Sequence, residues 1–425
     1  NMLNHRRHSI LTLAILGVIA SPAAMAVEFE TGNPDLSIRL DNSVRYNLGQ
    51  RVESRDPKIG NTAIADEGTY SFDRGDIVTN RLDLLTELDV VYKGRMGFRV
   101  STSAWYDDAY DGSTRGNPNP PLSQIPSYVG KQFSNTTDRL YAGPSGEVLD
   151  AFVFANFEVA EVPTRVKVGR HTQYWGESLL LGGNLHSVAY AQNPLDLQKG
   201  FATPGVEAKE LFRPLNQISG SAQITDTLSL AAQYLFEWEE ARYPEGGTYL
   251  GPVDFAFNGP NRQFINPTLG FANRSAASEP NQQGEYGLSA KWNPEWLDGT
   301  LGFYYRNYAD KLPQVLITKV GPNSQSQYTN VYADDISLVG VSLSKNIAGV
   351  SVGAEVSYRD NTPLVSQTLG IAPGLPAAGE TKGPRGNTYH ALINGLGTLP
   401  KTDFFDVATW LTELTYAQLD KVTSG

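Results

Sequence analysis

A histidine and a serine seven positions apart raise the question of nucleophilic catalysis. His171 and Ser178 are the residue types with which some membrane phospholipases build a serine–histidine pair on the surface of their strands. No G-x-S-x-G element surrounds a serine here, and the spacing identifies no acid that would orient the histidine. We therefore predict that the chain is not an enzyme, and we interpret His171 as a histidine that only forms hydrogen bonds.

Acidic residues gather in one predicted turn. Asp107, Asp108 and Asp111 precede Gly112 and offer the oxygen ligands that a hard cation prefers. The spacing differs from that of an EF-hand loop, so a solvated acidic loop is favoured over a cation site. Beyond residue 26 the chain has three histidines, which are His171, His186 and His390. The sequence therefore predicts neither a multi-histidine metal site nor a cofactor.

The amino terminus has the features of an export signal. Arg6 and Arg7 precede an apolar run at 10–20, which ends in small residues at Ala24-Met25-Ala26. This pattern predicts a secretory signal peptide over residues 2–26, cleaved before Val27, and the alternative is an amphipathic or buried N-terminal helix. The run is shorter than the roughly 20 residues of a spanning helix, and no later stretch is as long, so a helical membrane protein is excluded.

Composition narrows the class of protein further. The net charge is -11, and loss of Arg6 and Arg7 with the signal would make it -11 - 2 = -13. An acidic exported chain is a poor partner for nucleic acid. Because the chain has 0 cysteines, disulfides cannot stabilise it. A closed barrel in lipid needs none, since its backbone groups pair between strands.

Hydrophobicity alternates with a period of two. From Leu36 to Leu48 the even positions are mostly apolar, whereas the odd positions carry Arg39, Asp41 and Arg45. The same alternation recurs at 81–92 and at 96–107, and it is typical of strands between lipid and a wet lumen. Further strands of this kind are predicted at 149–159, 165–174, 218–224, 228–238, 286–292, 301–308, 337–343, 350–358 and 407–416.

The connections alternate as well. Short turns such as 93–95 and 160–163 are separated by long polar stretches at 51–74, 108–146, 175–213, 240–283, 309–330 and 360–403. This arrangement predicts an all-β fold over residues 27–425, a transmembrane antiparallel up-and-down β-barrel of about 12 strands with periplasmic turns and long extracellular loops. A soluble β-sandwich is the alternative, but long loops at every second connection are uncommon there.

Charged residues of both signs lie on the odd, inward-facing rows. Mixed charge indicates cross-strand pairing along a wet wall rather than a filter of one sign. The predicted lumen-lining residues are Arg39, Arg45, Arg81, Asp83, Glu87, Arg99, Arg165, Lys167, Glu285, Glu355 and Arg359.

The connection at 175–213 is unusually apolar for an outside loop, with Leu179, Leu180, Leu181, Val188, Leu195, Leu197 and Phe201. It is a candidate for a hatch or constriction folded into the lumen, and the alternative is a loop packed on the outer rim or on a neighbouring subunit. The residues assigned to this hatch are His171, Trp175, Glu177, Glu207, Lys209 and Glu210.

Three stretches resemble a known family. They are Val168-Gly169-Arg170-His171-Thr172-Gln173-Tyr174-Trp175-Gly176-Glu177-Ser178, Pro204-Gly205-Val206-Glu207-Ala208-Lys209-Glu210-Leu211-Phe212 and Glu355-Val356-Ser357-Tyr358-Arg359. The chain resembles the family called Domain of Unknown Function 1302 over essentially its whole mature length. Its members usually continue beyond the strand at 415–417, so the resemblance predicts that this chain, which ends at Gly425, is truncated at its C-terminus.

The resemblance also implies a setting. Family members are regarded as Gram-negative outer-membrane proteins, often encoded near a periplasmic lipoprotein-sorting-like partner and an inner-membrane transporter of the lipid-exporting type. This implies transport of hydrophobic or amphiphilic small molecules or lipids, with outer-membrane lipids, lipopolysaccharide and the barrel-assembly machinery as further partners. A general diffusion porin is one alternative. An outer-membrane enzyme or a structural surface barrel is another.

Overall fold

A computed structural model describes residues 23–62, 64–110, 112–118, 126–255, 257–319, 321, 325–364 and 382–424. A single 14-stranded sheet forms the wall of the molecule, and its neighbouring strands pair antiparallel in chain order. The wall strands are β1 (Ala23–Phe29), β2 (Leu36–Gln50), β3 (Ile77–Tyr92), β4 (Met96–Asp107), β5 (Ser145–Val159), β6 (Val162–His171), β7 (Leu215–Gln223), β8 (Leu228–Leu235), β11 (Tyr286–Trp292), β12 (Thr300–Tyr308), β15 (Ile336–Ile347), β16 (Val350–Pro363), β17 (Arg385–Leu399) and β18 (Ala408–Ser424).

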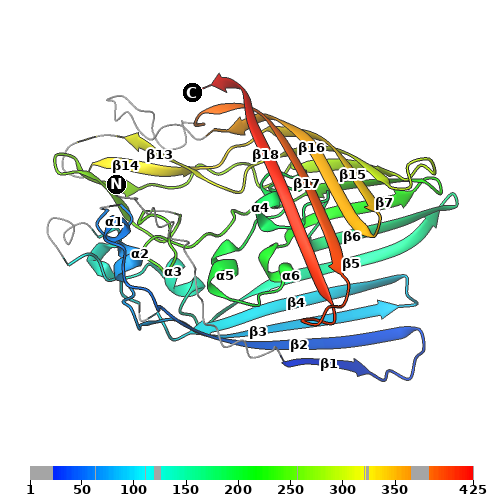
Figure 1. Cartoon of the computed structure of the whole chain (residues 1–425), viewed down its shortest axis with the longest axis horizontal. Coiled ribbons are helices and arrows are strands. Elements are labelled where there is room, and N and C mark those ends of the chain that lie inside the picture. Colours follow the sequence, from blue (N-terminus) through cyan, green and yellow to red (C-terminus); the bar gives the residue numbers. More distant parts are fainter. Residues whose placement is uncertain are drawn as a thin grey trace, which may run out of the picture.

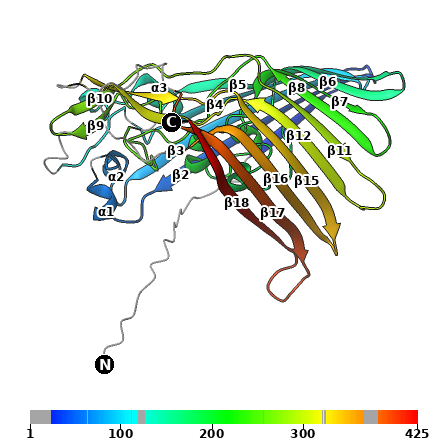
Figure 2. The same ribbon diagram turned by 90° about the horizontal axis from the view of Figure 1, so that it is seen from above.

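The sheet curves strongly, so that β2–β4 and β16–β18 lie on opposite sides of a concave interior (Figures 1 and 2). Within the described residues β1 pairs with β2 alone and β18 with β17 alone. The prediction of an all-β, antiparallel up-and-down fold is therefore confirmed.

The two faces of the wall differ as the period of two predicts. On β3, Leu82 and Leu84 point outward with 50% and 41% of their surface exposed, whereas Arg81 and Asp83 point inward and are each 2% exposed. Polar groups on the outer face can pair with each other, since the Thr86 hydroxyl donates to Asn42 Oδ1 at 2.8 Å. The convex face is thus apolar and the concave face charged.

Tight turns close one end of the wall. Ala160 and Glu161 between β5 and β6 have φ of 48° and 69°, and Ala348 and Gly349 between β15 and β16 have φ of 51° and 86°. Two successive residues with positive φ are the signature of a type I′ turn, whose twist matches that of the paired strands. The other end carries the long connections (Figure 1).

The long connections hold more regular structure than the sequence predicts. A second sheet, in the order β13-β14-β10-β9, lies within stretches predicted as loops. Its strands are β9 (Arg262–Asn266), β10 (Gly270–Arg274), β13 (Gln314–Lys319) and β14 (Ser326–Val331). The remaining elements are short helices: α1 (Pro57–Gly60), α2 (Glu67–Tyr70), η2 (Val129–Lys131), α3 (Asn135–Leu140), α4 (Leu181–Asn184), α5 (Leu197–Ala202) and α6 (Ala208–Leu211).

Two predictions about the wall need correction. The connection predicted at 360–403 contains β17, and a further strand, β1, precedes the first predicted one, so the wall has 14 strands rather than about 12. Strand β1 begins at Ala23, four residues before the predicted cleavage point. Residues 2–22 of the predicted signal peptide lie outside the described residues, and its cleavage stays a prediction.

No helix among the described residues is long and apolar enough to cross a membrane. The largest apolar cluster instead joins the interior to the wall. Trp175 and Val188 pack there against Tyr304, Ile336 and Leu338 of β12 and β15. The connection between β6 and β7 is therefore part of the core of the molecule.

Candidate functional site

The segment between β6 and β7, residues 172–214, runs through the concave interior with α4, α5 and α6 (Figure 1). We call it the plug segment; it includes the predicted hatch at 175–213. Of its apolar residues, Val188, Leu195 and Leu197 are buried. Leu179, Leu180 and Phe201 remain between 44% and 51% exposed. Apolar burial thus holds only part of this segment in place.

Charged residues attach the plug segment to β2 and β3. Arg45 on β2 donates to both carboxylate oxygens of Glu210, at 2.9 and 3.2 Å, and to the Gly205 carbonyl at 3.3 Å. Lys209 forms an ion pair with Glu87 on β3. Since Arg45 and Glu210 are both buried, removing one partner would leave the other as an unpaired buried charge.

The opposite side of the plug segment is held through its backbone. Arg306 on β12 donates to the carbonyls of Val188 at 3.0 Å and Tyr190 at 2.6 Å. Arg359 on β16 donates to the carbonyls of Leu185 and Ser187. A segment with little regular structure cannot pair its own backbone groups, so these wall arginines take the place of a helix or strand partner.

Wall carboxylates accept the backbone N–H groups of the same region. Glu355 on β16 accepts from Val188 at 2.8 Å and from Glu177. Glu413 on β18 accepts from Leu179 at 2.8 Å and Leu180 at 3.2 Å. The plug segment therefore has polar contacts with strands on both sides of the interior.

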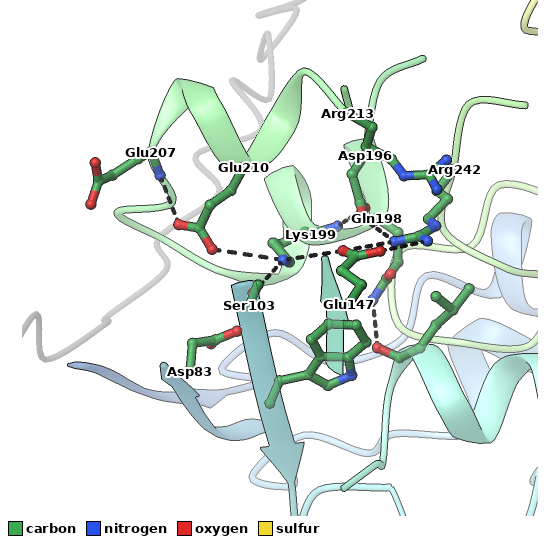
Figure 3. A network of polar contacts seen from close by, with 12 residues as sticks. Asp83, Ser103, Glu147, Asp196, Gln198, Lys199, Glu207, Glu210, Arg213 and Arg242 are labelled. Carbon is green, nitrogen blue, oxygen red and sulfur yellow. Dashed lines mark hydrogen bonds and ion pairs between the residues drawn. The ribbon is translucent and has the colours of Figure 1, made fainter. Parts of the chain in front are cut away.

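A network of ion pairs lies around α5 and α6 (Figure 3). The Lys199 ammonium donates to Ser103 Oγ at 3.2 Å and lies 3.7 Å from Glu210 and 3.9 Å from Glu147. Glu147 on β5 accepts from both terminal nitrogens of Arg242, which also donates to Asp196 at 3.0 Å. The network thus links the plug segment to the wall and to the chain that follows β8.

Burial and neighbouring charges shift the pKa values of this network in opposite directions. Burial alone would raise the pKa of Glu210, but its hydrogen bonds with Arg45 and the charge of Lys199 outweigh burial and lower the pKa below its usual value. Burial alone would lower the pKa of Arg242, and Asp196 and Glu147 raise it instead. Both side chains are therefore charged at neutral pH.

The predicted lumen residues fall into two groups. Arg45, Glu87, Glu355 and Arg359 contact the plug segment. The others lie on the concave wall or above it. Arg81 pairs with Asp83 of the same set, and the remaining pairs are with other charged residues: Arg39 with Asp41, Arg99 with Asp89, and Glu285 with Lys311. Arg165 and Lys167 lie over the rings of Phe154 and Phe152.

The residues assigned to the hatch are also dispersed. Glu207, Lys209 and Glu210 lie at α6, and Trp175 and Glu177 lie against the wall strands β12 to β17.

The sequence analysis did not predict five residues that contact the plug segment or belong to it, which are Asp196, Lys199, Glu147, Arg242 and Glu413. One signal was available, because Asp196 three residues before Lys199 is an N-cap pattern, and its side chain does accept from the Lys199 N–H at 2.9 Å.

His171 is the last residue of β6, and it lies beside a different serine from the one that the sequence suggested. Its Nε2 is 2.7 Å from Ser219 Oγ on β7, and its Nδ1 is 2.9 Å from the Gly169 carbonyl. The Ser178 hydroxyl instead donates to the Leu180 carbonyl. His171 and Ser219 are buried, and no acid among the described residues forms a hydrogen bond with the histidine, so this pair has the geometry of a structural hydrogen bond.

The structure describes two carboxylates of the acidic turn, Asp107 and Asp108, and each accepts from groups of the protein itself. Asp107 accepts from the backbone N–H groups of Asn80 and Ala109, both at 2.9 Å. Asp108 contacts Tyr106, and Asp111 lies outside the described residues. In the described part of the chain, no three histidine or acidic side chains are arranged to hold a metal ion.

A cavity of about 740 Å³ lies between the plug segment, α3 and the chain after β8. Arg139 of α3, Glu147 of β5 and Arg213 of the plug segment line it. Residues 238–243 and Glu245 form another side of the cavity, and Glu279 lies at its exposed rim. The cavity is therefore at the loop end of the molecule and has the plug segment as one boundary.

Three outer loops meet at a buried acidic junction near this end. Asp254 accepts from the backbone N–H groups of Asp66 and Glu67, both at 3.0 Å, and Glu67 accepts from the Ser127 N–H. Burial raises the pKa of Glu67 to about 8, and burial with the charge of Glu67 raises that of Asp254 to about 9. These carboxyls are therefore mainly protonated at neutral pH.

The junction should lose stability as the pH rises. An unfolded loop ionises its acids near pH 4, whereas the folded junction keeps Glu67 and Asp254 protonated to about pH 8 and 9. Their contribution is therefore complete below about pH 4 and is lost as the pH rises through 8 to 9. Hydrogen exchange of residues 64–72, corrected for intrinsic rates, should show more frequent opening at pH 9 than at pH 5. Glu67→Gln should weaken this dependence, and stronger protection at pH 9 would contradict it.

A comparison with protein families gives a match over nearly the whole chain. The model of a family described as "Protein of unknown function (DUF1302)" matches residues 7–425. No curated protein that was compared with the chain matches it.

Several solved structures share a distant likeness. The high-pH structure of Pseudomonas putida OprB is 13% identical, and the match covers 91% of each of the two chains, with a TM-score of 0.26. Salmonella typhi OmpF in complex with daunomycin is 9% identical, over 92% of this chain and 100% of that one, with a TM-score of 0.26. The Pseudomonas putida toluene transporter TodX is 11% identical, and the match covers 93% of this chain and 80% of that one, with a TM-score of 0.25. TM-scores of this size do not establish a common function.

Proposed function

The chain belongs to the family described as "Protein of unknown function (DUF1302)", and we propose that it transports hydrophobic or amphiphilic small molecules, lipids included, across the outer membrane of a Gram-negative bacterium. The wall would span the membrane, and the plug segment would control passage through the interior. Export would depend on the predicted signal peptide at 2–26.

The surface of the wall supports a place in a membrane. Large apolar side chains are exposed along the middle of the outward face, among them Leu84, Val153, Phe303 and Val356, at 41% to 61%. A soluble protein rarely leaves so many in one band. Tyrosines at strand ends, such as Tyr92 and Tyr106, are also exposed, as in the aromatic girdles of membrane barrels.

The observation that carries the proposal is the attachment of the plug segment to both sides of the interior. Arg45 and Glu87 hold it on one side, and Arg306, Glu355 and Arg359 hold it on the other. A general diffusion porin needs a continuous water path, which a segment fixed across the lumen interrupts. Passage would then require the plug segment to move, as in a gated transporter.

The setting implied by the family extends this proposal. Short turns would face the periplasm and could meet a lipoprotein-sorting-like shuttle, which in turn would exchange its load with an inner-membrane transporter. Outer-membrane lipids, lipopolysaccharide and the barrel-assembly machinery would be the partners at the membrane. Catalysis has less support, because the buried His171–Ser219 pair does not line the cavity.

A reversible crosslink can test whether the plug segment moves. A Cβ atom on Gly340 of β15 would lie 2.4 Å from Val188 Cγ1, so Val188→Cys with Gly340→Cys places two thiols near disulfide reach. The chain has 0 cysteines of its own. In Gram-negative cells, entry of N-phenyl-1-naphthylamine through the oxidised variant should fall to the level of cells without the protein, and reductant should restore it.

The single variant Val188→Cys is the matched control and should respond to neither treatment. Unchanged entry through a fully crosslinked protein would contradict a gate formed by the plug segment. Entry of hydrophilic sugars at rates that depend only on their size, in either redox state, would favour a general porin instead.

A further inference from the structure

The cavity beside the plug segment contains more acid than base. Five glutamates and four arginines line it, namely Glu147, Glu239, Glu240, Glu245, Glu279, Arg139, Arg170, Arg213 and Arg242. Two more acids, Glu237 and Asp196, share these arginines from behind the lining. Lys199 at 3.9 Å from Glu147 adds one positive charge, which is itself shared with Glu210. Burial raises the pKa of Glu245 to about 8, so it adds little charge at neutral pH, but the other acids still outnumber the basic groups.

The arginines are largely occupied. Arg170 pairs with Glu237 at 2.8 Å and Glu239 at 2.9 Å, Arg213 pairs with Glu239, and Arg242 pairs with Glu147 and Asp196. Arg139 has no ion pair in the described part of the chain, and it is exposed at the rim, where water screens its charge. An anionic ligand would therefore have to compete with carboxylates that already hold the inner arginines.

Three acids of the lining, Glu240, Glu245 and Glu279, form no ion pair in the described part of the chain. Burial raises the pKa of Glu245 to about 8, so this side chain is mainly neutral at neutral pH, and Glu240 and Glu279 remain. Glu240 accepts from the neutral amide of Asn258 at 2.7 Å, and Glu279 is exposed at the rim. Neither forms an ion pair within the described ranges. Burial raises the pKa of Glu240, and the charge of the nearby Glu279 carboxylate raises it further. A positive charge placed between them would relieve this repulsion.

An aromatic surface lies in the same cavity. The rings of Tyr243 and Phe257 stack with their centroids 5.1 Å apart and an angle of 14° between their planes, and both residues line the cavity. Such faces carry partial negative charge and attract ammonium groups, while they also accommodate apolar groups. The aromatic pair and the two carboxylates therefore favour the same class of ligand.

We propose that this cavity binds an organic cation, a primary or quaternary ammonium group attached to an apolar body. Glu240 and Glu279 bind the charged group, and the Tyr243–Phe257 stack contacts the apolar part. The inference deepens the proposed function and rests on it in one respect: the cavity has the plug segment as one boundary, so a molecule that passes this segment would be held there.

Binding can be measured directly with small probes of matched shape. The full chain in detergent micelles would be titrated by calorimetry with benzyltrimethylammonium, with benzyl alcohol and with benzenesulfonate. We expect benzyltrimethylammonium to bind at least about tenfold more tightly than either other probe, with an affinity that falls as salt is added.

Charge-removing variants locate the site. Glu240→Gln with Glu279→Gln should weaken cation binding at least about tenfold, because hydrogen bonds to charged groups contribute roughly that much in affinity. The matched control is Glu295→Gln, which removes one exposed carboxylate from the turn between β11 and β12 and should leave binding unchanged. Tighter binding of benzenesulfonate, or cation affinity equal in the double variant and the unaltered chain, would overturn the proposal.

A second measurement separates this inference from transport. Uptake of benzyltrimethylammonium and N-phenyl-1-naphthylamine would be followed in cells that lack general porins. Loss of cation binding in the double variant without any uptake by the unaltered chain would support the site and refute transport. Uptake of N-phenyl-1-naphthylamine with no cation binding would support transport and refute the site.

Discussion

Deletion of residues 182–202 should convert a poorly conducting barrel into an open pore. These residues include most of α4 and the whole of α5, with Val188 and Lys199, so the deletion removes the centre of the plug segment. We expect single-channel conductance in planar bilayers to rise at least about tenfold, because a wall with this many strands, once closed into a barrel, would enclose a lumen that is filled with water when nothing else occupies it. Large antibiotics should also gain access to cells that express the variant.

The wall should survive this deletion. Its strand pairings do not involve the removed residues, since β6 and β7 pair directly from Thr164 to His171. Arg306 and Arg359 would lose carbonyl partners, but water entering the lumen can replace them. Circular dichroism should retain the β-sheet spectrum. As a control, deletion of residues 56–61, which contain α1 in an outer loop, should leave conductance low.

Conductance that is already high in the intact chain, and that the deletion leaves unchanged, would contradict a plug in the lumen. The segment would then have to lie outside the permeation path in the membrane. General diffusion would become the better description of the function.

Alternation in the sequence was sufficient to predict most of the wall. The inward and outward rows of β2, β3 and β4 follow directly from a period of two, because one face must suit lipid and the other water. The alternation did not predict β17, because Leu392 and Ile393 are both apolar although they lie on opposite faces of the sheet, which interrupts the period of two. Leu392 is 3% exposed on the inward side, close to His390, which contacts His186 of the plug segment. Where the plug segment covers the wall, the inner face no longer needs to be polar.

The arrangement of the plug segment could not be predicted to the same degree. Its apolar residues indicated burial, but the contacts that position it join residues far apart in the chain, such as Arg45 and Glu210, which are separated by 165 positions. Nothing in the sequence identifies a backbone carbonyl, such as that of Val188, that accepts a hydrogen bond from Arg306. The cavity likewise depends on loops that meet only in three dimensions, so its excess of carboxylates emerges from the structure.

The second large effect concerns the outer face of the wall. Leu84→Arg places a charge near the middle of β3, on an outward side chain that is 41% exposed. If that face meets hydrocarbon, the substitution should cost about 2 to 4 kcal/mol in the free energy of unfolding from lipid. Folding titrations into lipid vesicles with increasing urea would measure the loss.

The matched control lies in the same part of the wall, because Ser43 on β2 pairs with Leu85, the residue next to Leu84. Ser43 faces inward, two positions from both Asp41 and Arg45, and it is only partly buried. Ser43→Arg therefore adds the same charge to the inward face, where the Asp41 carboxylate two positions away can pair with it, and it should lower the free energy of unfolding by less than Leu84→Arg does. Equal losses for the two variants would show that the outward row does not face lipid, and the membrane-spanning wall would have to be abandoned.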